Sequence, residues 1–114
     1  SGDLKMIAAA SGGTAAPTAL AWTAVNLFLE KLTLPKAIDR PRMHHGGKPD
    51  QVLFEPGSPN EWLVGLERRG HSVSVAGEIG RINAFHCEFG LAVGNQCFHS
   101  SDPRGHGLAI SLSQ

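Results

Sequence analysis

The chain has 114 residues, which is enough for one domain with a modest core and too few for two. Its 10 Lys and Arg residues balance its 10 Asp and Glu residues, so no net charge attracts nucleic acid or an anionic membrane surface. The composition is globular, and we find neither an apolar run of transmembrane length nor a signal peptide. We expect a single domain over residues 1–114, with no nucleic-acid partner and no membrane segment.

Two adjacent glycines, Gly12 and Gly13, separate an apolar segment from a helical pattern near the start of the chain. Asp3–Ala10 predicts a buried strand, and apolar side chains three and four residues apart over Pro17–Leu32 predict a helix. Glycines turn where a Cβ would clash, and a helix start leaves N–H groups without partners. The pattern therefore indicates N–H groups aimed at an anion, such as a carboxylate or the oxyanion of acyl transfer. A plain tight turn is the alternative, and no phosphate-binding signature accompanies the glycines.

Short elements follow in the middle of the chain. Leu34–Asp39 predicts a short helix with Thr33 as its N-cap, and the prolines and glycines of Arg40–Asp50 predict a loop. Gln51–Glu55 then has the pattern of a short strand.

A capping box marks the next helix. We expect Ser58 at the N-cap, Pro59 at the first helical position and Glu61 three residues after the cap. Gly70 fits the left-handed position just beyond the helix end. The buried face of this helix comprises three apolar residues, Trp62, Leu63 and Leu66.

The last part of the chain predicts strands. His71–Ala76 alternates and should have its valines inward. Ile82–Val93 is strand-like, and a turn at Gly94-Asn95 returns the chain as a strand over Gln96–Ser100. One face of the first of these two strands carries Phe85, Cys87 and Phe89.

Two residue pairs can meet across this hairpin. Cys87 and Cys97 form either a disulfide or two free thiols. His86 and His99 approach each other if the register of the strands allows it.

The order of elements is strand, helix, helix, strand, helix and then several strands, which predicts a mixed α/β or α+β layered fold. The first strand has no sequential neighbour, so we expect its pairing partner outside this chain. An unpaired strand edge also predicts association of the chain into a homo-oligomer.

Two polar motifs invite a chemical interpretation. His44 and His45 are adjacent without a metal-ligand spacing, so we expect them to bond to loop neighbours and to hold no metal. Asp102-Pro103-Arg104 predicts a rigid turn with an ion pair available. No Ser or Cys lies in a nucleophile elbow, so the chain offers an oxyanion-hole candidate without an attacking group.

Taken in order, four landmarks resemble the C-terminal part of a gamma-glutamyltransferase small subunit. Their order and spacing match the family over nearly the whole chain, although Met43 replaces a usual Phe and Ser11 a usual Pro. The landmarks are the Gly12-Gly13 turn, the Ala37–His45 stretch, Val52–Glu55 with the capped helix and Gly70–Val73 after it, and Ser101–Arg104.

The resemblance implies a fold and a reaction. The fold is the N-terminal nucleophile hydrolase αββα sandwich, in which a mixed sheet carries helices on one face. The reaction is attack of a Thr on the γ-glutamyl carbonyl of glutathione-like compounds, followed by transfer to water or an acceptor, without a cofactor. The Thr nucleophile is absent from this chain, so we expect the chain alone to be inactive.

The resemblance also assigns residues. Gly12 and Gly13 would form the oxyanion hole with their backbone N–H groups, and Ser11 would lie against the substrate. A structural motif would comprise Arg42, His44, His45, Asp102 and Arg104, with the two arginines as ion-pair partners.

The implied partners are the remainder of the small subunit, the large subunit and a γ-glutamyl substrate. Members of the family are often periplasmic or secreted, but the sequence leaves the compartment open. A non-catalytic, stand-alone binding module derived from this fold is the alternative.

Overall fold

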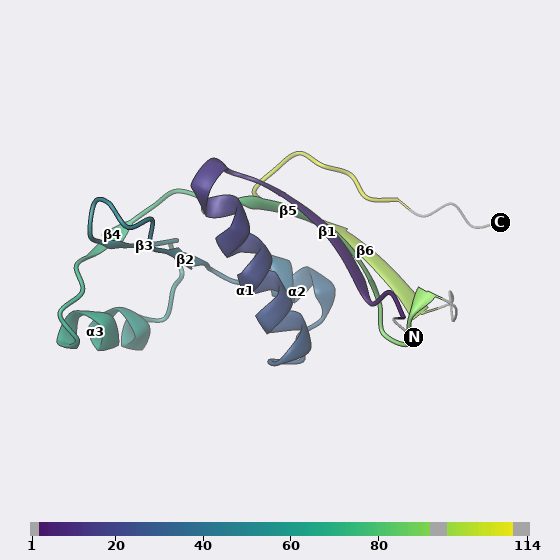
Figure 1. The fold of residues 1–114 in the computed structure, drawn as a ribbon, viewed down its shortest axis with the longest axis horizontal. Coiled ribbons are helices and arrows are strands. Elements are labelled where there is room, and N and C mark those ends of the chain that lie inside the picture. The colour runs from purple at the N-terminus through teal and green to yellow at the C-terminus, as the bar shows by residue number, and fades with distance from the viewer. Residues whose placement is uncertain (1–2, 92–95, 111–114) are drawn as a thin grey trace.

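The computed structural model describes residues 3–91 and 96–110. The fold is elongated, with extents of 52 × 28 × 23 Å, and a small sheet with one helix lies at one end (Figure 1). The elements in chain order are β1 (Met6–Ser11), the 3₁₀ turn η1 (Gly13–Ala15), α1 (Ala16–Phe28), α2 (Leu34–Asp39), β2 (Met43–His44), β3 (Val52–Phe54), α3 (Asn60–Arg68), β4 (Val73–Val75), β5 (Arg81–Cys87) and β6 (Cys97–Ser101).

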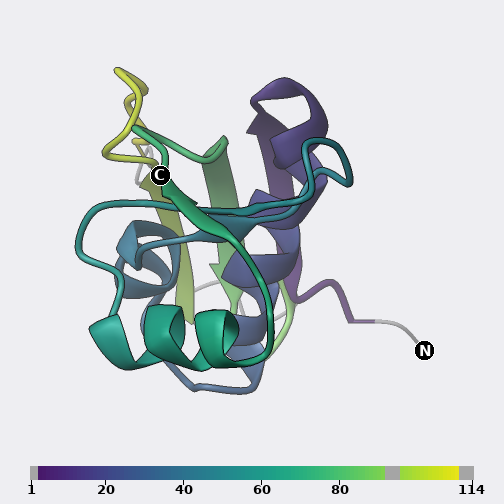
Figure 2. The ribbon, with the colours of Figure 1, turned by 90° about the vertical axis from the view of Figure 1, so that its left-hand side faces the viewer.

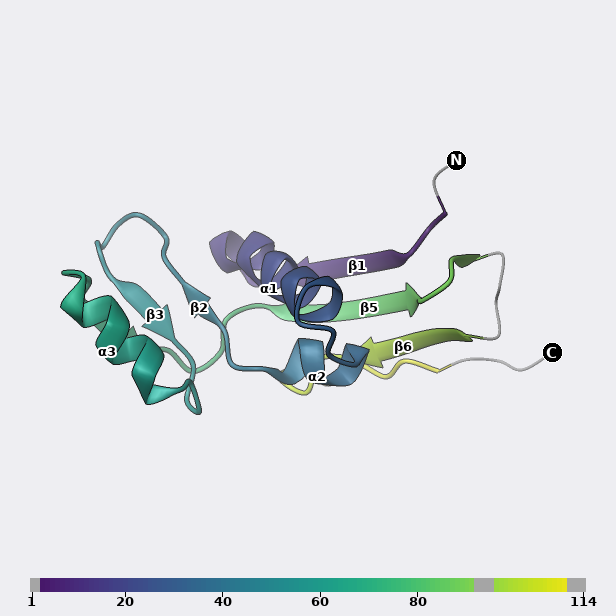
Figure 3. The same ribbon diagram turned by 90° about the horizontal axis from the view of Figure 1, so that it is seen from below.

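The larger sheet has the antiparallel order β1-β5-β6, and α1 and α2 cover one of its faces (Figure 3). Alternation along β5 directs Ile82 and Ala84 toward the helices, where they are buried. The core between sheet and helices comprises Ala19, Leu27, Leu34, Ala37, Ile38, Ile82 and Ala84.

The smaller sheet has the order β2-β3-β4 and is mixed. Figure 2 views the molecule from the end where this sheet and α3 lie. β2 pairs antiparallel with β3, whereas β3 and β4 are parallel because α3 forms the connection between them. The indole N–H of Trp22 on α1 donates to the carbonyl of Met43 at 2.8 Å, and the rings of Trp22 and Trp62 lie 5.9 Å apart. These contacts join the small sheet and α3 to the larger layer.

The structure confirms the mixed α+β fold and helices on one face of a sheet, with two qualifications. The sheet beneath the helices is antiparallel, and the mixed sheet is the smaller one. The predicted short helix over Leu34–Asp39 has the expected bounds.

The expectations for the first strand were wrong in two respects. β1 pairs with β5 inside the chain, so its neighbour is distant in sequence and not outside the molecule. Its residues alternate between half-buried and exposed, and Ile7 is 55% exposed, so β1 is not a buried strand. Its other edge has no strand beside it among the described residues.

The capping box does not form. The hydroxyl of Ser58 donates to the carbonyl of Glu55 at 2.8 Å, and α3 begins at Asn60 with Pro59 at the N-cap. The expected buried face of α3 is only half-buried, whereas Gly70 has the expected positive φ of 89° after the helix end.

Three further expectations need correction in the strands. β2 lies inside the predicted loop, because its two residues pair with β3. Val75 is 63% exposed and does not point inward. β5 ends at Cys87, so Phe89, 53% exposed, lies beyond the strand.

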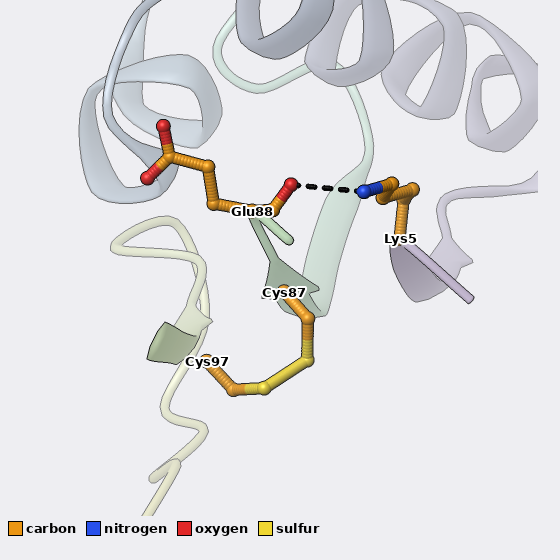
Figure 4. Close-up of a disulfide and its surroundings, with 4 residues drawn as sticks. All are labelled: Lys5, Cys87, Glu88 and Cys97. Atoms are coloured by element: carbon orange, nitrogen blue, oxygen red, sulfur yellow. Dashed lines mark hydrogen bonds between the residues drawn. A yellow bond between two sulfur atoms is a disulfide. The ribbon is translucent and has the colours of Figure 1, made fainter. Parts of the chain in front are cut away.

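Cys87 and Cys97 form a disulfide between β5 and β6 (Figure 4). Such a short cross-link removes about 2–3 kcal/mol of chain entropy from the unfolded state. The strand register places His86 opposite Phe98 and His99 opposite Phe85, so the two histidines lie on opposite faces and do not meet.

The predicted turn at Gly94-Asn95 lies outside the described residues. None of the helices in residues 3–91 and 96–110 has both the length and the apolarity to cross a membrane.

Candidate functional site

The bend between β1 and α1 is built from Gly12 and Gly13. Gly12 has φ 127° and Gly13 has φ 61°, values in the region that glycine adopts readily. The carbonyl of Gly12 accepts from the N–H of Ala15 at 3.2 Å, and the carbonyl of Gly13 accepts from Ala16. In the part of the chain that the structure describes, neither glycine N–H donates a hydrogen bond, and both residues are exposed. The bend therefore presents two N–H groups at a helix start, where the helix dipole is positive.

A charged network lies behind this bend and connects the two sheets. Arg42 is fully buried, and its guanidinium donates to Asp102 at 2.9 Å and to the carbonyl of Ile38 at 2.9 Å. The same group donates to the carbonyls of Ile79 and Gly80 at 3.0 and 3.1 Å. Arg42 thus joins the end of α2, the segment before β5 and the segment after β6.

Arg104 completes the network from the other side. Its guanidinium contacts both Glu55 and Asp102, with Nε 2.7 Å from Glu55 Oε1 and Nη1 3.0 Å from Asp102 Oδ1. It also donates to the carbonyl of Ile38 at 2.9 Å. Glu55 in turn accepts from the backbone N–H of Arg42 at 3.0 Å. The predicted ion pair of the Asp-Pro-Arg turn is thus present, and it belongs to a four-residue cluster.

The network determines the charge state of its carboxylates. Burial alone would raise the pKa of Glu55, but hydrogen bonds from Arg104, Ile79 and Arg42 outweigh it and lower that pKa. Burial likewise acts to raise the pKa of Asp102, and hydrogen bonds from Arg104, Ile82 and Arg42 lower it.

The arginines differ from each other. Burial and the nearby charge of Arg104 lower the pKa of Arg42 despite its bonds to Asp102. Burial also acts to lower the pKa of Arg104, but its bonds to Glu55 and Asp102 outweigh burial and raise it. Within the described residues, Arg42 Nε is buried without a hydrogen-bond partner.

The other candidate residues lie apart from the network. Ser11 ends β1 next to the bend and is exposed. His44 Nδ1 is 2.7 Å from the hydroxyl of Thr18, whereas His45 Nε2 is 3.0 Å from Asp50 on the exposed loop. No group of three or more metal-ligating side chains is found within residues 3–91 and 96–110.

Two residues of the site received no role from sequence reasoning. Glu55 ends a predicted strand, and a single acidic residue there carries no signal for a long-range pair. Gly80 ends a glycine-containing turn, and its packing depends on β1 and α1, which are distant in sequence. Both roles arise from tertiary contacts.

Two cavities lie away from the bend. One, of about 510 Å³, opens between the C-terminal part of α1 and the disulfide end of the sheet, with Phe28, His86 and Phe98 in its lining. The other, of about 340 Å³, lies beside Arg104 and Glu55. Neither is lined by Gly12 or Gly13.

Comparison with known proteins shows the family of the chain. The model of the Gamma-glutamyltranspeptidase family matches residues 1–112. The chain belongs to the gamma-glutamyltranspeptidase family. This confirms the resemblance found in the sequence landmarks.

Curated relatives of this family member include scoloptoxins SSD14 and SSD20 of Scolopendra dehaani. Each is 36% identical to the chain over 81 residues, which is 71% of the chain. The matched part is 14% of SSD14 and 41% of SSD20, so the chain spans less than half of either relative.

Solved structures share the fold of this gamma-glutamyltranspeptidase family member. The gamma-glutamyltranspeptidase from Pseudomonas nitroreducens complexed with L-DON has a TM-score of 0.81 at 24% identity, over 96% of this chain and 56% of that one. Transpeptidase CapD of Bacillus anthracis has a TM-score of 0.77 at 19% identity, over 94% and 63%. Cephalosporin acylase from Bacillus halodurans has a TM-score of 0.80 at 22% identity, over 94% and 20%.

Proposed function

We propose that this chain is the C-terminal part of the small subunit of a γ-glutamyl acyltransferase/hydrolase, and that Gly12 and Gly13 form its oxyanion hole. The observation that carries the proposal is the bend itself, whose two N–H groups donate no hydrogen bond among the described residues. The bend precedes a helix in a chain that matches the family over residues 1–112. The fold alone does not assign an activity, but two N–H groups without a partner in the described part of the chain are the donors that an oxyanion hole needs.

In the proposed reaction, a Thr hydroxyl from the preceding part of the protein attacks the γ-carbonyl of a glutathione-like compound. The α-amino group of that Thr accepts the hydroxyl proton, and the carbonyl oxygen becomes an oxyanion between the two N–H groups of the bend. Each such donor lowers the barrier by about 3 kcal/mol. The leaving amine departs with a proton, and water or an acceptor amine then resolves the acyl-enzyme.

Ser11 suits contact with the substrate, because its exposed hydroxyl lies next to the bend. The remainder of the small subunit and the large subunit are the proposed partners, since they would supply the nucleophile and cover the sheet face opposite α1 and α2. No cofactor is required, because a hydroxyl nucleophile and a general base suffice for acyl transfer.

The first prediction concerns Gly13→Val in the complete protein. Space around Gly13 is open, with no atom within 4 Å of an added Cβ, so the substitution acts through the backbone. A β-branched residue disfavours φ 61°, and the N–H groups of the bend must move. We expect kcat with γ-glutamyl-p-nitroanilide to fall on the order of 100-fold or more, with the fold retained by circular dichroism.

Gly47→Val is the matched control for this prediction. Gly47 also has a positive φ, of 91°, and open space around it, but it lies in the loop after His45. Its substitution should leave kcat unchanged. Equal turnover in the Gly13 variant and the wild type would remove the bend from the oxyanion role.

A non-catalytic binding module is the second candidate. It is favoured by the pairing of β1 with β5 inside the chain, which gives the sheet three strands without outside help. Release of p-nitroaniline by the complete protein would exclude this candidate, and its absence would support it. The chain by itself should release none in either case.

A further inference from the structure

The backbone of Gly80 forms a wall directly behind the bend. A Cβ on Gly12 would stand 2.8 Å from Gly80 Cα, so the two backbones touch with no side chain between them. Real Cβ atoms do not approach other carbon atoms this closely. The position of Gly12 is therefore set by the position of Gly80.

Gly80 also contacts the two segments that the bend connects. Its φ is 70°, and a Cβ there would stand 2.6 Å from the Cβ of Ala19 on α1. The same Cβ would stand 3.3 Å from the carbonyl oxygen of Ala15 and 3.4 Å from that of Ser11. The strand end, the bend and the helix start thus share one close-packed contact that admits no side chain.

The charged network keeps this wall in place. Arg42 donates to the carbonyls of both Ile79 and Gly80, at 3.0 and 3.1 Å. The N–H of Ile79 donates to Glu55 Oε1 at 2.7 Å, and Ile79 itself is 2% exposed. Because these donors and acceptors are buried, Gly80 cannot retreat without breaking charge-assisted hydrogen bonds.

We infer that Gly80 is a positioning residue for the oxyanion hole, and that it sets the orientation of the Gly12 and Gly13 N–H groups. This inference rests on the proposed function. An oxyanion hole acts only when its donors are fixed before the reaction, and a displacement of about 1 Å costs on the order of 100-fold in rate. A backbone wall without a side chain supplies such a fixed reference.

The test is Gly80→Ala in the complete protein. The added methyl group meets Ala19 and the backbone around the bend, so the bend must shift. We expect kcat with γ-glutamyl-p-nitroanilide to fall on the order of 100-fold, with KM nearly unchanged. Affinity for a γ-boronic acid analogue of glutamate, which becomes tetrahedral and anionic, should fall by a similar factor. If Gly80 contributed to stability alone, the substitution would leave the analogue affinity of the folded protein unchanged, as it leaves KM.

Two further variants sharpen the test. Gly70→Ala is the control, because Gly70 has φ 89° and open space around it in the turn after α3, and it should keep wild-type kcat. Ala19→Gly added to Gly80→Ala removes the methyl carbon at 2.6 Å and should restore part of kcat and of analogue affinity.

The outcomes separate the inference from the proposed function. A folded Gly80→Ala protein with wild-type kcat, beside a slow Gly13→Val protein, overturns the positioning role and leaves the oxyanion hole in place. Wild-type kcat in both overturns the proposed function. If Gly80→Ala does not fold, the double variant with Ala19→Gly decides. Its added Cβ still stands 3.3 Å from the carbonyl oxygen of Ala15, so kcat and analogue affinity below the wild-type values support the inference. Wild-type values of both overturn it.

Discussion

At the scale of single residues, Arg42 is central to the charged network. Its side chain is fully buried and bonds to three backbone carbonyls and to Asp102, while its backbone N–H bonds to Glu55. A buried ion pair of this kind adds little net stability over an apolar pair, but removing one partner leaves the other charge uncompensated. Removing Arg42 should therefore cost more stability than the ion pair contributes to the folded protein.

We predict that Arg42→Met lowers the free energy of unfolding by about 3–5 kcal/mol. Asp102 and Glu55 would then share a single arginine, Arg104, and the carbonyls of Ile79 and Gly80 would lose the Arg42 donor. Urea unfolding of the chain measures the change. Arg81→Met is the control, since Arg81 pairs with Glu78 at 3.1 Å with both side chains about half exposed. That variant should lose less than about 1 kcal/mol. Similar losses in the two variants would contradict the structural role of the network.

At the scale of elements, β1 is an edge strand of the larger sheet in the described residues. Its exposed residues include Ile7. Apolar side chains are also exposed at Val25 on α1, at 43%, and at Leu29 just after α1, at 73%. An edge strand with apolar neighbours is a template for pairing with another chain. Association of the chain into a homo-oligomer through this edge stays a prediction.

We predict that the chain prepared alone self-associates, and that Ile7→Lys weakens this association by placing a charge on the exposed face of β1. Sedimentation velocity over a concentration series measures it. Leu108→Lys, which changes a residue 84% exposed outside the strands, is the matched control. A wild-type chain that stays monomeric at every concentration would refute the prediction.

Local patterns succeeded where neighbouring residues determine the structure. The short helix over Leu34–Asp39 has the expected bounds, because its proline and apolar spacing act within one turn. The strand over Met43–His44 was missed, because it exists only through pairing with β3. The capping box at Ser58 does not form, because the Ser58 hydroxyl bonds to the backbone carbonyl of Glu55 instead of to an N–H group of the helix.

The candidate site shows the same division. The sequence predicted the glycine bend and the Asp-Pro-Arg turn, because each is formed by residues adjacent in the chain. Two other features depend on segments that only the fold brings together. They are the contact of the Gly80 backbone with the bend and the bonds of Glu55 to both Arg42 and Arg104. No single sequence indicates such contacts.

At the scale of the whole molecule, the network joins the two sheets. Glu55 follows β3 in the small sheet, whereas Asp102 and Arg104 follow β6 in the larger one. The contact between the tilted rings of Trp22 and Trp62 adds a second connection, and the Arg40 guanidinium lies 5.2 Å from the Trp62 ring. Unfolding of either sheet therefore disturbs the other, and the charge state of the network should affect the entire molecule.

We predict that the chain loses stability as pH falls below about 5. The folded-state pKa values of Glu55 and Asp102 lie below their ordinary values of 4.5 and 3.8. The unfolded chain therefore binds protons first as pH falls, and the stabilisation present at neutral pH disappears through the folded-state pKa values. Urea unfolding from pH 7 to about pH 3 measures the slope. Glu55→Gln should flatten it, and an unchanged slope would contradict this assignment.

The contact between Gly12 and Gly80 means that two positions 68 residues apart in numbering cannot vary independently. A mutational library that changes either codon singly would recover mostly defective clones. A library around the bend should therefore leave both codons untouched and draw its diversity from the exposed positions nearby, beginning with Ser11 and Thr14.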